Sequence, residues 1–141
     1  MKDYRHGSHT AFSIHLHIVW ITKYRKKVLK GDIAIFVRDV IRQECNKLPV
    51  DILKGHVSKD HVHIMVSIPP QLTISRLVQR VKGKSSYLVL SKFPPLKKVY
   101  WGRHFWARGY FVRSSGNVTD EVIKAYIENQ SNDGDNFQIA G

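Results

Sequence analysis

Two short apolar runs joined by a tight turn constrain the fold of this chain most. The runs from Val50 to Val57 and from His61 to Ile68 are separated only by Ser58-Lys59-Asp60, and two prolines end the second run. Such runs predict an antiparallel pair of strands, and proline cannot continue a strand within a sheet. Successive side chains on a strand point to opposite faces, so His61 and His63 share one face. The pair therefore predicts two adjacent imidazoles, which make up part of a metal site but not all of it.

Other patterns predict the remaining elements of an α+β domain. Five further segments show strand or helix periodicity: strands at Ser13–Thr22 and Tyr110–Val112, and helices at Asp32–Lys47, Thr73–Leu90 and Thr119–Gln130. The first of these strands holds a second His-x-His pair, His15 and His17. Spacing alone cannot rank the two histidine pairs as metal ligands.

The composition indicates one basic globular domain. The chain has 141 residues, 43% of them hydrophobic, and a formal net charge of +12. A positive field of this size on a small domain favours nucleic acid as the partner. No apolar run is long enough to cross a bilayer or to form a signal peptide, so we expect a cytoplasmic protein without a membrane partner. The single cysteine, Cys45, excludes an internal disulfide.

Basic residues gather in three stretches that also hold aromatic rings. The candidates for contacting DNA are Lys23, Tyr24, Arg25 and Lys26 after the first strand, Lys82 and Lys84 on the second long helix, and Arg103 and Arg108 within the aromatic tract from Phe93 to Arg113. Aromatic rings can stack on unpaired bases, while cations contact phosphates. The segment from Lys82 to Ser86 lacks the upstream glycine of a phosphate-binding loop and lies within a helical pattern. We therefore expect no nucleotide cofactor.

The last predicted helix carries two groups that suit the missing chemistry. Tyr126 and Gln130 are four residues apart, so they lie on one helix face. The carbonyl oxygen of Gln130 can bind a divalent cation, and the phenol of Tyr126 can act as a nucleophile. Each also has an ordinary structural interpretation, the tyrosine as a packing ring and the glutamine as a solvated helix end.

Taken together, these motifs resemble the single-tyrosine HUH transposases of the smallest bacterial and archaeal insertion sequences. HUH denotes two histidines around a hydrophobic residue. The resemblance runs from Arg5 to Gln130 and is carried, in order, by His17-Ile18-Val19-Trp20, Lys23 to Leu29, Gly55-His56-Val57, Asp60 to Ile64, Lys82 to Ser86, Trp101, Trp106 to Phe111, and Tyr126 to Gln130. An isolated His-x-His is weak support, whereas this ordered series is specific.

The resemblance implies a set of catalytic roles. His61, His63 and Gln130 would bind Mg²⁺ or Mn²⁺, and Tyr126 would attack the scissile phosphate of single-stranded DNA. The products would be a 5′-phosphotyrosine link and a free 3′-OH, which a second 3′-OH can later resolve without a nucleotide. The resemblance also ranks His61 and His63 above the pair in the first strand.

It further implies the fold and the assembly. The fold would be ferredoxin-like, a four-stranded antiparallel sheet with packed helices, formed by residues 1–141 as one HUH domain. Within it we expect a loose N-terminal arm at 1–12, a hinge at 114–117, a catalytic helix at 119–130 and an irregular polar tail at 131–141. The chain would form a homodimer in which the Tyr126 helix of one subunit completes the histidine site of the other. The substrates would be element ends that fold into imperfect single-stranded hairpins.

Three alternatives stay open at this point. The first is a domesticated relative with the same chemistry that acts on repeated extragenic palindromes. The second is a non-catalytic module that binds single-stranded nucleic acid on a ferredoxin-like sheet, although such a module has no need for a His-x-His strand with a Tyr-x-x-x-Gln helix. The third is a zinc hydrolase, which would need a further histidine or carboxylate ligand that the sequence does not offer at a known spacing.

Overall fold

A five-stranded sheet forms the centre of the protein. The computed structural model describes residues 5–6, 11–12, 15–100, 104–114, 125 and 138–139. The strand order is β6-β3-β5-β4-β7, with bounds β3 His15–Ile21, β4 Asp51–Val57, β5 His61–Ser67, β6 Phe111–Ser114 and β7 Gln138–Ile139. Strands β3 to β6 pair antiparallel, whereas β7 pairs parallel to β4. The pairing of β3 with β5 puts the two His-x-His strands side by side in the middle of the sheet.

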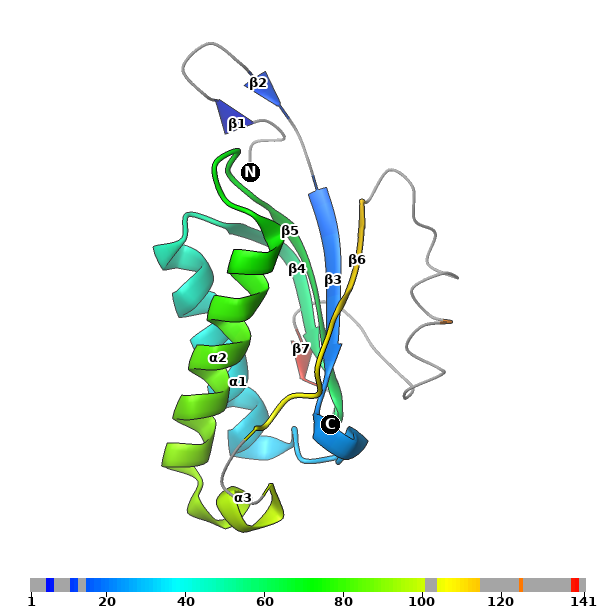
Figure 1. The fold of residues 1–141 in the computed structure, drawn as a ribbon, viewed down its shortest axis with the longest axis vertical. Coiled ribbons are helices and arrows are strands. Elements are labelled where there is room, and N and C mark those ends of the chain that lie inside the picture. The colour runs from blue at the N-terminus through cyan, green and yellow to red at the C-terminus, as the bar shows by residue number, and fades with distance from the viewer. Residues whose placement is uncertain are drawn as a thin grey trace.

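Two long helices cover one face of the sheet (Figure 1). Helices α1 Gly31–Lys47 and α2 Ile74–Lys92 lie against the strands, and the short α3 Pro94–Val99 follows α2. Alternate strand residues such as Ile18, Trp20 and Ile64 are buried in a single apolar cluster with residues of α1 and α2. The residues between them, including His17, His61 and His63, point to the opposite face because side chains alternate along each strand.

The predicted α+β fold with a four-stranded antiparallel sheet is confirmed by this architecture. The strands and the first two helices occur where their periodicity predicts them. Helix α3 was not predicted, because Pro94 and Pro95 fall in the aromatic and basic tract from Phe93 to Arg113, which was expected to form a loop. Proline suits the first turn of a helix, where its missing N–H has no intrahelical partner to lose, and here both prolines open α3.

The two ends of the chain contain short strands that the sequence did not predict. The arm at 1–12 contains a small antiparallel pair, β1 Arg5–His6 and β2 Ala11–Phe12. Within the predicted polar tail, β7 pairs with the outer edge of β4, which offers backbone groups that a short strand can bind. Ser114, predicted as the start of a hinge, is the last residue of β6. Residues 115–117 and, apart from Ala125, the predicted catalytic helix lie outside the described residues. None of the described helices is long and apolar enough to cross a membrane.

Candidate active site

Strand β5 carries the two predicted metal ligands on the face that α1 and α2 leave uncovered. His61 pairs with Ile21 of β3, and His63 pairs with Val19 of β3 and His56 of β4. Val62 and Ile64, which alternate with them, belong to the core under the helices. The central position of β5, paired on both sides, therefore fixes the backbone that presents both imidazoles.

A buried carboxylate orients the first of these histidines. His61 Nδ1 lies 3.1 Å from Asp60 Oδ1, and the side chains of His61 and Asp60 are only 1% and 2% exposed. When Nδ1–H donates to the carboxylate, Nε2 is the ring nitrogen left for binding a cation. A carboxylate behind a histidine is a common arrangement at metal centres, since it fixes the tautomer and raises the basicity of the ligand.

The second histidine is held neutral by its surroundings. Burial is the largest cause that lowers the pKa of His63, and together with the neighbouring rings of His17, His61 and His56, in that order, it brings this pKa to about 4. The closest of these is His17, whose Nδ1 lies 3.0 Å from His63 Nε2. A histidine with this pKa is uncharged at neutral pH and can bind a cation without first releasing a proton.

The two histidines that are not predicted ligands line the same face. His17, from the rival pair in β3, contacts His63 with ring centroids 5.2 Å apart. His56 Nε2 lies 2.6 Å from the hydroxyl of Ser58, and its ring centroid is 6.2 Å from that of His61. Four imidazoles thus gather on the face opposite α1 and α2, with His61 and His63 in the middle.

This donor set fits a divalent cation but does not complete a site. Two adjacent imidazoles, one of them oriented by a carboxylate, suit a borderline metal ion. The part of the chain described by the structure holds no group of three or more His, Cys, Asp or Glu residues arranged to bind a metal. Further ligands must therefore come from another residue type, from the rest of the chain or from a partner. Tyr126 and Gln130, predicted to supply the nucleophile and the third ligand, lie outside the described residues, as does Arg103.

A strained basic turn adjoins the histidines. Residues Lys23–Arg25 form a single 3₁₀ turn in which Tyr24 and Arg25 have φ of +62° and +52°. Non-glycine residues rarely adopt this left-handed conformation, and it is concentrated at functional sites. Two contacts tie this turn to Asp60. The backbone N–H of Thr22 donates to the carbonyl of Asp60 at 2.9 Å, and Arg25 Nε lies 3.9 Å from Asp60 Oδ2. Lys23 and Lys26 hold their ammonium groups over the exposed Tyr24 ring, at 5.3 and 6.0 Å from its centroid. Four predicted DNA contacts are thereby brought to the Asp60 end of β5.

The Lys82-to-Ser86 segment has a structural role that the sequence did not reveal. Lys82 Nζ donates to the carbonyls of Ala107 and Gly109 at 2.8 and 2.9 Å. Ser85 Oγ accepts from the indole N–H of Trp106 at 2.9 Å, and Ser86 Oγ accepts from the backbone N–H of Phe105 at 3.2 Å. One face of α2 therefore fastens the loop from His104 to Gly109, which places exposed Arg108 beside α2. Lys84 remains exposed.

Comparison with known proteins agrees with this arrangement. The family model described as "Transposase IS200 like" matches residues 10–130. The transposase of insertion sequence element IS200 from Salmonella typhimurium is 35% identical over 130 residues, which cover 92% of this chain and 85% of that protein. The crystal structure of a transposase-like protein from Deinococcus radiodurans R1 has a TM-score of 0.79 and 31% identity, covering 90% of this chain and 98% of that one. A REP-associated tyrosine transposase bound to a REP hairpin shares the fold at a TM-score of 0.56 and 15% identity, covering 91% of this chain and 72% of that one.

The fold and the matches define a DNA-processing enzyme of the transposase class. The chain belongs to the IS200-like family of single-tyrosine transposases.

Proposed function

We propose that this transposase cleaves and rejoins single-stranded DNA by metal-assisted transesterification at hairpin-flanked ends. The observation that carries the proposal is the buried Asp60–His61 pair beside neutral His63, on the face of the sheet opposite α1 and α2. From the resemblance of Tyr126 to Gln130 to the family's motif, we assign Tyr126 as the nucleophile and Gln130 as the third ligand. The alternative of a non-catalytic binding module gives no reason for a carboxylate-oriented histidine next to a second neutral one.

The chain's own groups would perform the reaction as follows. His61, His63 and Gln130 would hold Mg²⁺ or Mn²⁺, which when bound polarises the phosphoryl group and stabilises the charge that develops on it. The Tyr126 hydroxyl attacks phosphorus in line, a bond between the tyrosine oxygen and phosphorus forms, and the bond from phosphorus to the 3′ oxygen breaks. The proton lost by the phenol is balanced by the one gained by the leaving 3′-OH. In the rejoining step another 3′-OH attacks phosphorus and releases Tyr126, so no external energy source is consumed.

A covalent adduct tests this chemistry. Wild-type protein incubated with single-stranded hairpin DNA and Mg²⁺ or Mn²⁺ should give a protein–DNA adduct that survives denaturing electrophoresis. Tyr126→Phe should abolish the adduct while DNA binding is retained. Tyr24→Phe is the matched control, because Tyr24 is an exposed tyrosine in the turn beside Asp60 to which the resemblance assigns no nucleophilic role. An adduct that persists in Tyr126→Phe and disappears in Tyr24→Phe would assign the nucleophile to Tyr24 instead.

The substrate is inferred from the relatives. The REP-associated relative is bound to a hairpin, which supports hairpin DNA as the class of substrate here. Higher identity and coverage to the IS200 transposase favour an element-encoded enzyme over a domesticated one. Cleavage of the DNA that flanks the gene, compared with cleavage of palindromes dispersed elsewhere in the same genome, separates the two.

We further propose a homodimer in which each site draws its histidines from one subunit and its Tyr126 helix from the other. This arrangement predicts that His63→Ala and Tyr126→Phe proteins, each inactive alone, regain adduct formation when they are mixed and allowed to exchange subunits. Light scattering should report a dimer. A monomer that forms the adduct would contradict the shared site.

A further inference from the structure

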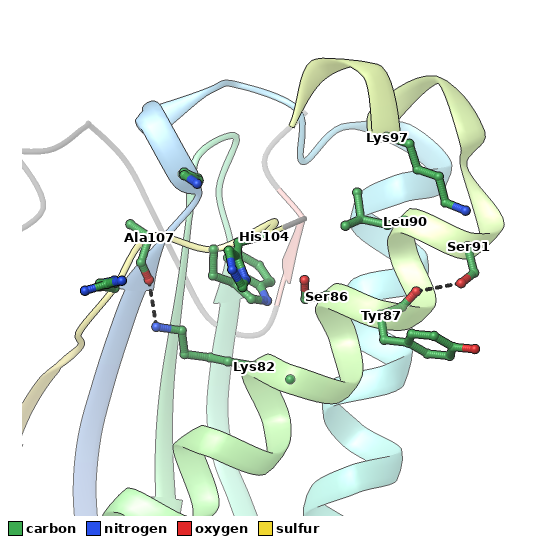
Figure 2. Close-up of a pocket in the computed structure, with 12 residues that line it drawn as sticks. Lys82, Ser86, Tyr87, Leu90, Ser91, Lys97, His104 and Ala107 are labelled. Carbon is green, nitrogen blue, oxygen red and sulfur yellow. Dashed lines mark hydrogen bonds between the residues drawn. The ribbon is translucent and has the colours of Figure 1, made fainter. Parts of the chain in front are cut away.

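A basic groove lies beside α2 (Figure 2). It has a volume of about 820 Å³, within the range of about 300–1,000 Å³ typical of ligand sites. Its walls come from α2, from Lys97 of α3 and from the loop that Lys82 ties to α2. Four cations line it, Lys23, Lys82, Lys97 and Arg108, and none of the described lining residues is acidic. A groove of this charge suits an anionic chain.

The wall of the groove contains a glycine for which the rest of the described protein gives no reason. Gly83 lies in the interior of α2, where glycine destabilises a helix by about 0.5–1 kcal/mol relative to alanine. A Cβ added to Gly83 would meet no atom within 4 Å. Neither crowding nor a left-handed backbone therefore requires glycine at this position. The absence of a side chain at Gly83 leaves that part of the groove open.

An exposed aromatic ring stands next to this opening. Tyr87 is four residues after Gly83, so the two share one face of α2, and its side chain is 69% exposed. A ring exposed to this extent beside cations is a platform on which an unpaired base can stack. Trp106, the other large ring in the lining, is buried and its indole N–H donates a hydrogen bond to Ser85 Oγ. It is therefore part of the wall of the groove.

We propose that this groove binds the unpaired DNA strand adjacent to the scissile phosphate. The phosphates lie against Lys97 and Arg108, and a base crosses the open surface at Gly83 to stack on Tyr87. The proposal rests on the proposed function, because it assigns part of the same single-stranded substrate to a surface outside the histidine site.

The backbone connects the groove to the histidines. Lys23 lines the groove and also opens the turn beside Asp60. Its N–H donates to the carbonyl of Phe105 at 2.9 Å, and the preceding N–H of Thr22 donates to the carbonyl of Asp60 at 2.9 Å. A strand that leaves the groove past Lys23 therefore arrives at the end of β5 that carries His61.

The dimensions favour a single strand over a duplex. The groove has room for a few nucleotide units, whereas a duplex presents its charge as a broad cylinder that could touch only the rim cations. Stacking on Tyr87 also requires a base that is not already paired.

The first test fills the groove without harming the helix. Gly83→Leu in a Tyr126→Phe background should weaken binding of a fluorescent single-stranded oligothymidine by roughly tenfold in anisotropy titrations, about one lost stacking contact. The melting temperature should stay equal or rise, because leucine is the better helix former. Unchanged oligothymidine binding by a folded Gly83→Leu protein would overturn the proposal.

The second test uses two neighbouring lysines on α3. Lys97 lines the groove and Lys98 does not, although both are exposed. Lys97→Glu should weaken oligothymidine binding and reduce the magnitude of the salt slope by about 1, as for one lost phosphate contact. Lys98→Glu is the matched control and should change both quantities much less. Equal effects of the two variants would show only a general charge effect and would contradict a groove.

Two further readouts separate this proposal from the proposed function. Duplex DNA should compete poorly with oligothymidine, and equal competition would overturn the assignment to an unpaired strand. If the wild-type protein forms the tyrosine adduct and the Gly83 and Lys97 variants bind normally, the groove is wrong and the chemistry stands. If the groove variants lose oligothymidine binding as expected while no adduct ever forms, the groove stands as a binding surface and the proposed catalysis fails.

Discussion

The two faces of the central sheet are built from the same strands, but one forms the apolar core and the other carries the candidate active site. The face under α1 and α2 is apolar, with Val62 and Ile64 of β5 at 0% and 1% exposed. The other face carries His61 and His63 from the same strand, with Asp60 just before them. Because side chains alternate, a shift of one residue along β5 passes from the core to the candidate active site. Stability and chemistry are therefore separable on one strand, residue by residue.

The faces also treat charge differently. On the helical side the single buried acid among the described core residues, Glu44 of α1, lies 2.9 Å from Arg80 Nε and 3.2 Å from Lys47 Nζ. Burial raises the pKa of Glu44, but the hydrogen bonds from Arg80 and Lys47 outweigh it and leave that pKa below its ordinary value. On the opposite face the histidines are crowded together and His63 is kept neutral. One face neutralises its charge internally, whereas the other gathers neutral donors that an added cation can use.

The largest effect should come from His63→Ala. Loss of one ligand should lower metal-dependent adduct formation by roughly a thousandfold, about 4 kcal/mol of transition-state stabilisation. The melting temperature should change little, since no core contact is removed. Single-turnover rates of adduct formation across a Mn²⁺ titration measure the loss. A rate that saturates at the wild-type value would mean that His63 is not a ligand.

Ile64→Ala should give the reverse pattern one residue further along. Removing a fully buried isoleucine from the core should lower the free energy of unfolding by about 2–5 kcal/mol. The rate of adduct formation by the folded fraction should remain within a fewfold of wild type. Urea unfolding followed by circular dichroism measures the first quantity. If Ile64→Ala abolished catalysis in protein that is still folded, the two faces would not be separable.

Asp60→Asn should show how far the carboxylate behind His61 matters. Loss of the buried carboxylate weakens the orientation and basicity of the imidazole, and such changes typically reduce metal affinity by about 10–100-fold. Isothermal titration with Mn²⁺ measures the affinity. The same titration of Asp51→Asn is the control, because Asp51 is an exposed carboxylate at the far end of β4. Equal affinities in both variants would leave Asp60 with a purely structural role.

Glu44→Gln should have a smaller effect, confined to stability and dependent on pH. The lowered pKa of Glu44 means that its contribution is present above the ordinary value of 4.5 and is lost as pH falls through the lowered value. Its partners are about half exposed, so we expect a loss of about 1 kcal/mol at neutral pH. The variant should also lose less stability than wild type between pH 6 and pH 3. Parallel pH curves for the two proteins would contradict this account.

The sequence predicts the helical face well because that face depends on periodicity. The three- and four-residue spacing of α1 and α2 and the alternation in β3 and β5 are local patterns, and they give the elements and the core directly. Helix α3 could not be predicted in this way, because Leu96, between prolines and lysines, is its one buried residue and gives no periodic pattern. The pairing of β7 with β4 joins residues about eighty apart and carries no local signal.

The same distinction between local patterns and tertiary contacts applies to the candidate site. Strand alternation predicts that His61 and His63 share a face, but it does not predict which residues surround them. The contact of His17 with His63 depends on the register of β3 against β5. The link from Lys82 to the carbonyls of Ala107 and Gly109 depends on how a loop folds back on α2. A lysine in a basic helical face looks like a phosphate contact in the sequence, and only the tertiary structure shows that two backbone carbonyls hold it.

The smallest expected effect is the absence of a reaction at Cys45. This thiol lies in α1 on the helical face, 1% exposed, and burial together with the charge of Glu44 raises its pKa to about 12. At pH 8 only about one thiol in ten thousand would then be ionised, so the native protein should not react with a thiol reagent within hours. Reaction should require opening of the helical face. Ile64→Ala should therefore accelerate modification of Cys45, measured by mass spectrometry, whereas His63→Ala should not. Equal acceleration by both variants would show that the two faces open together.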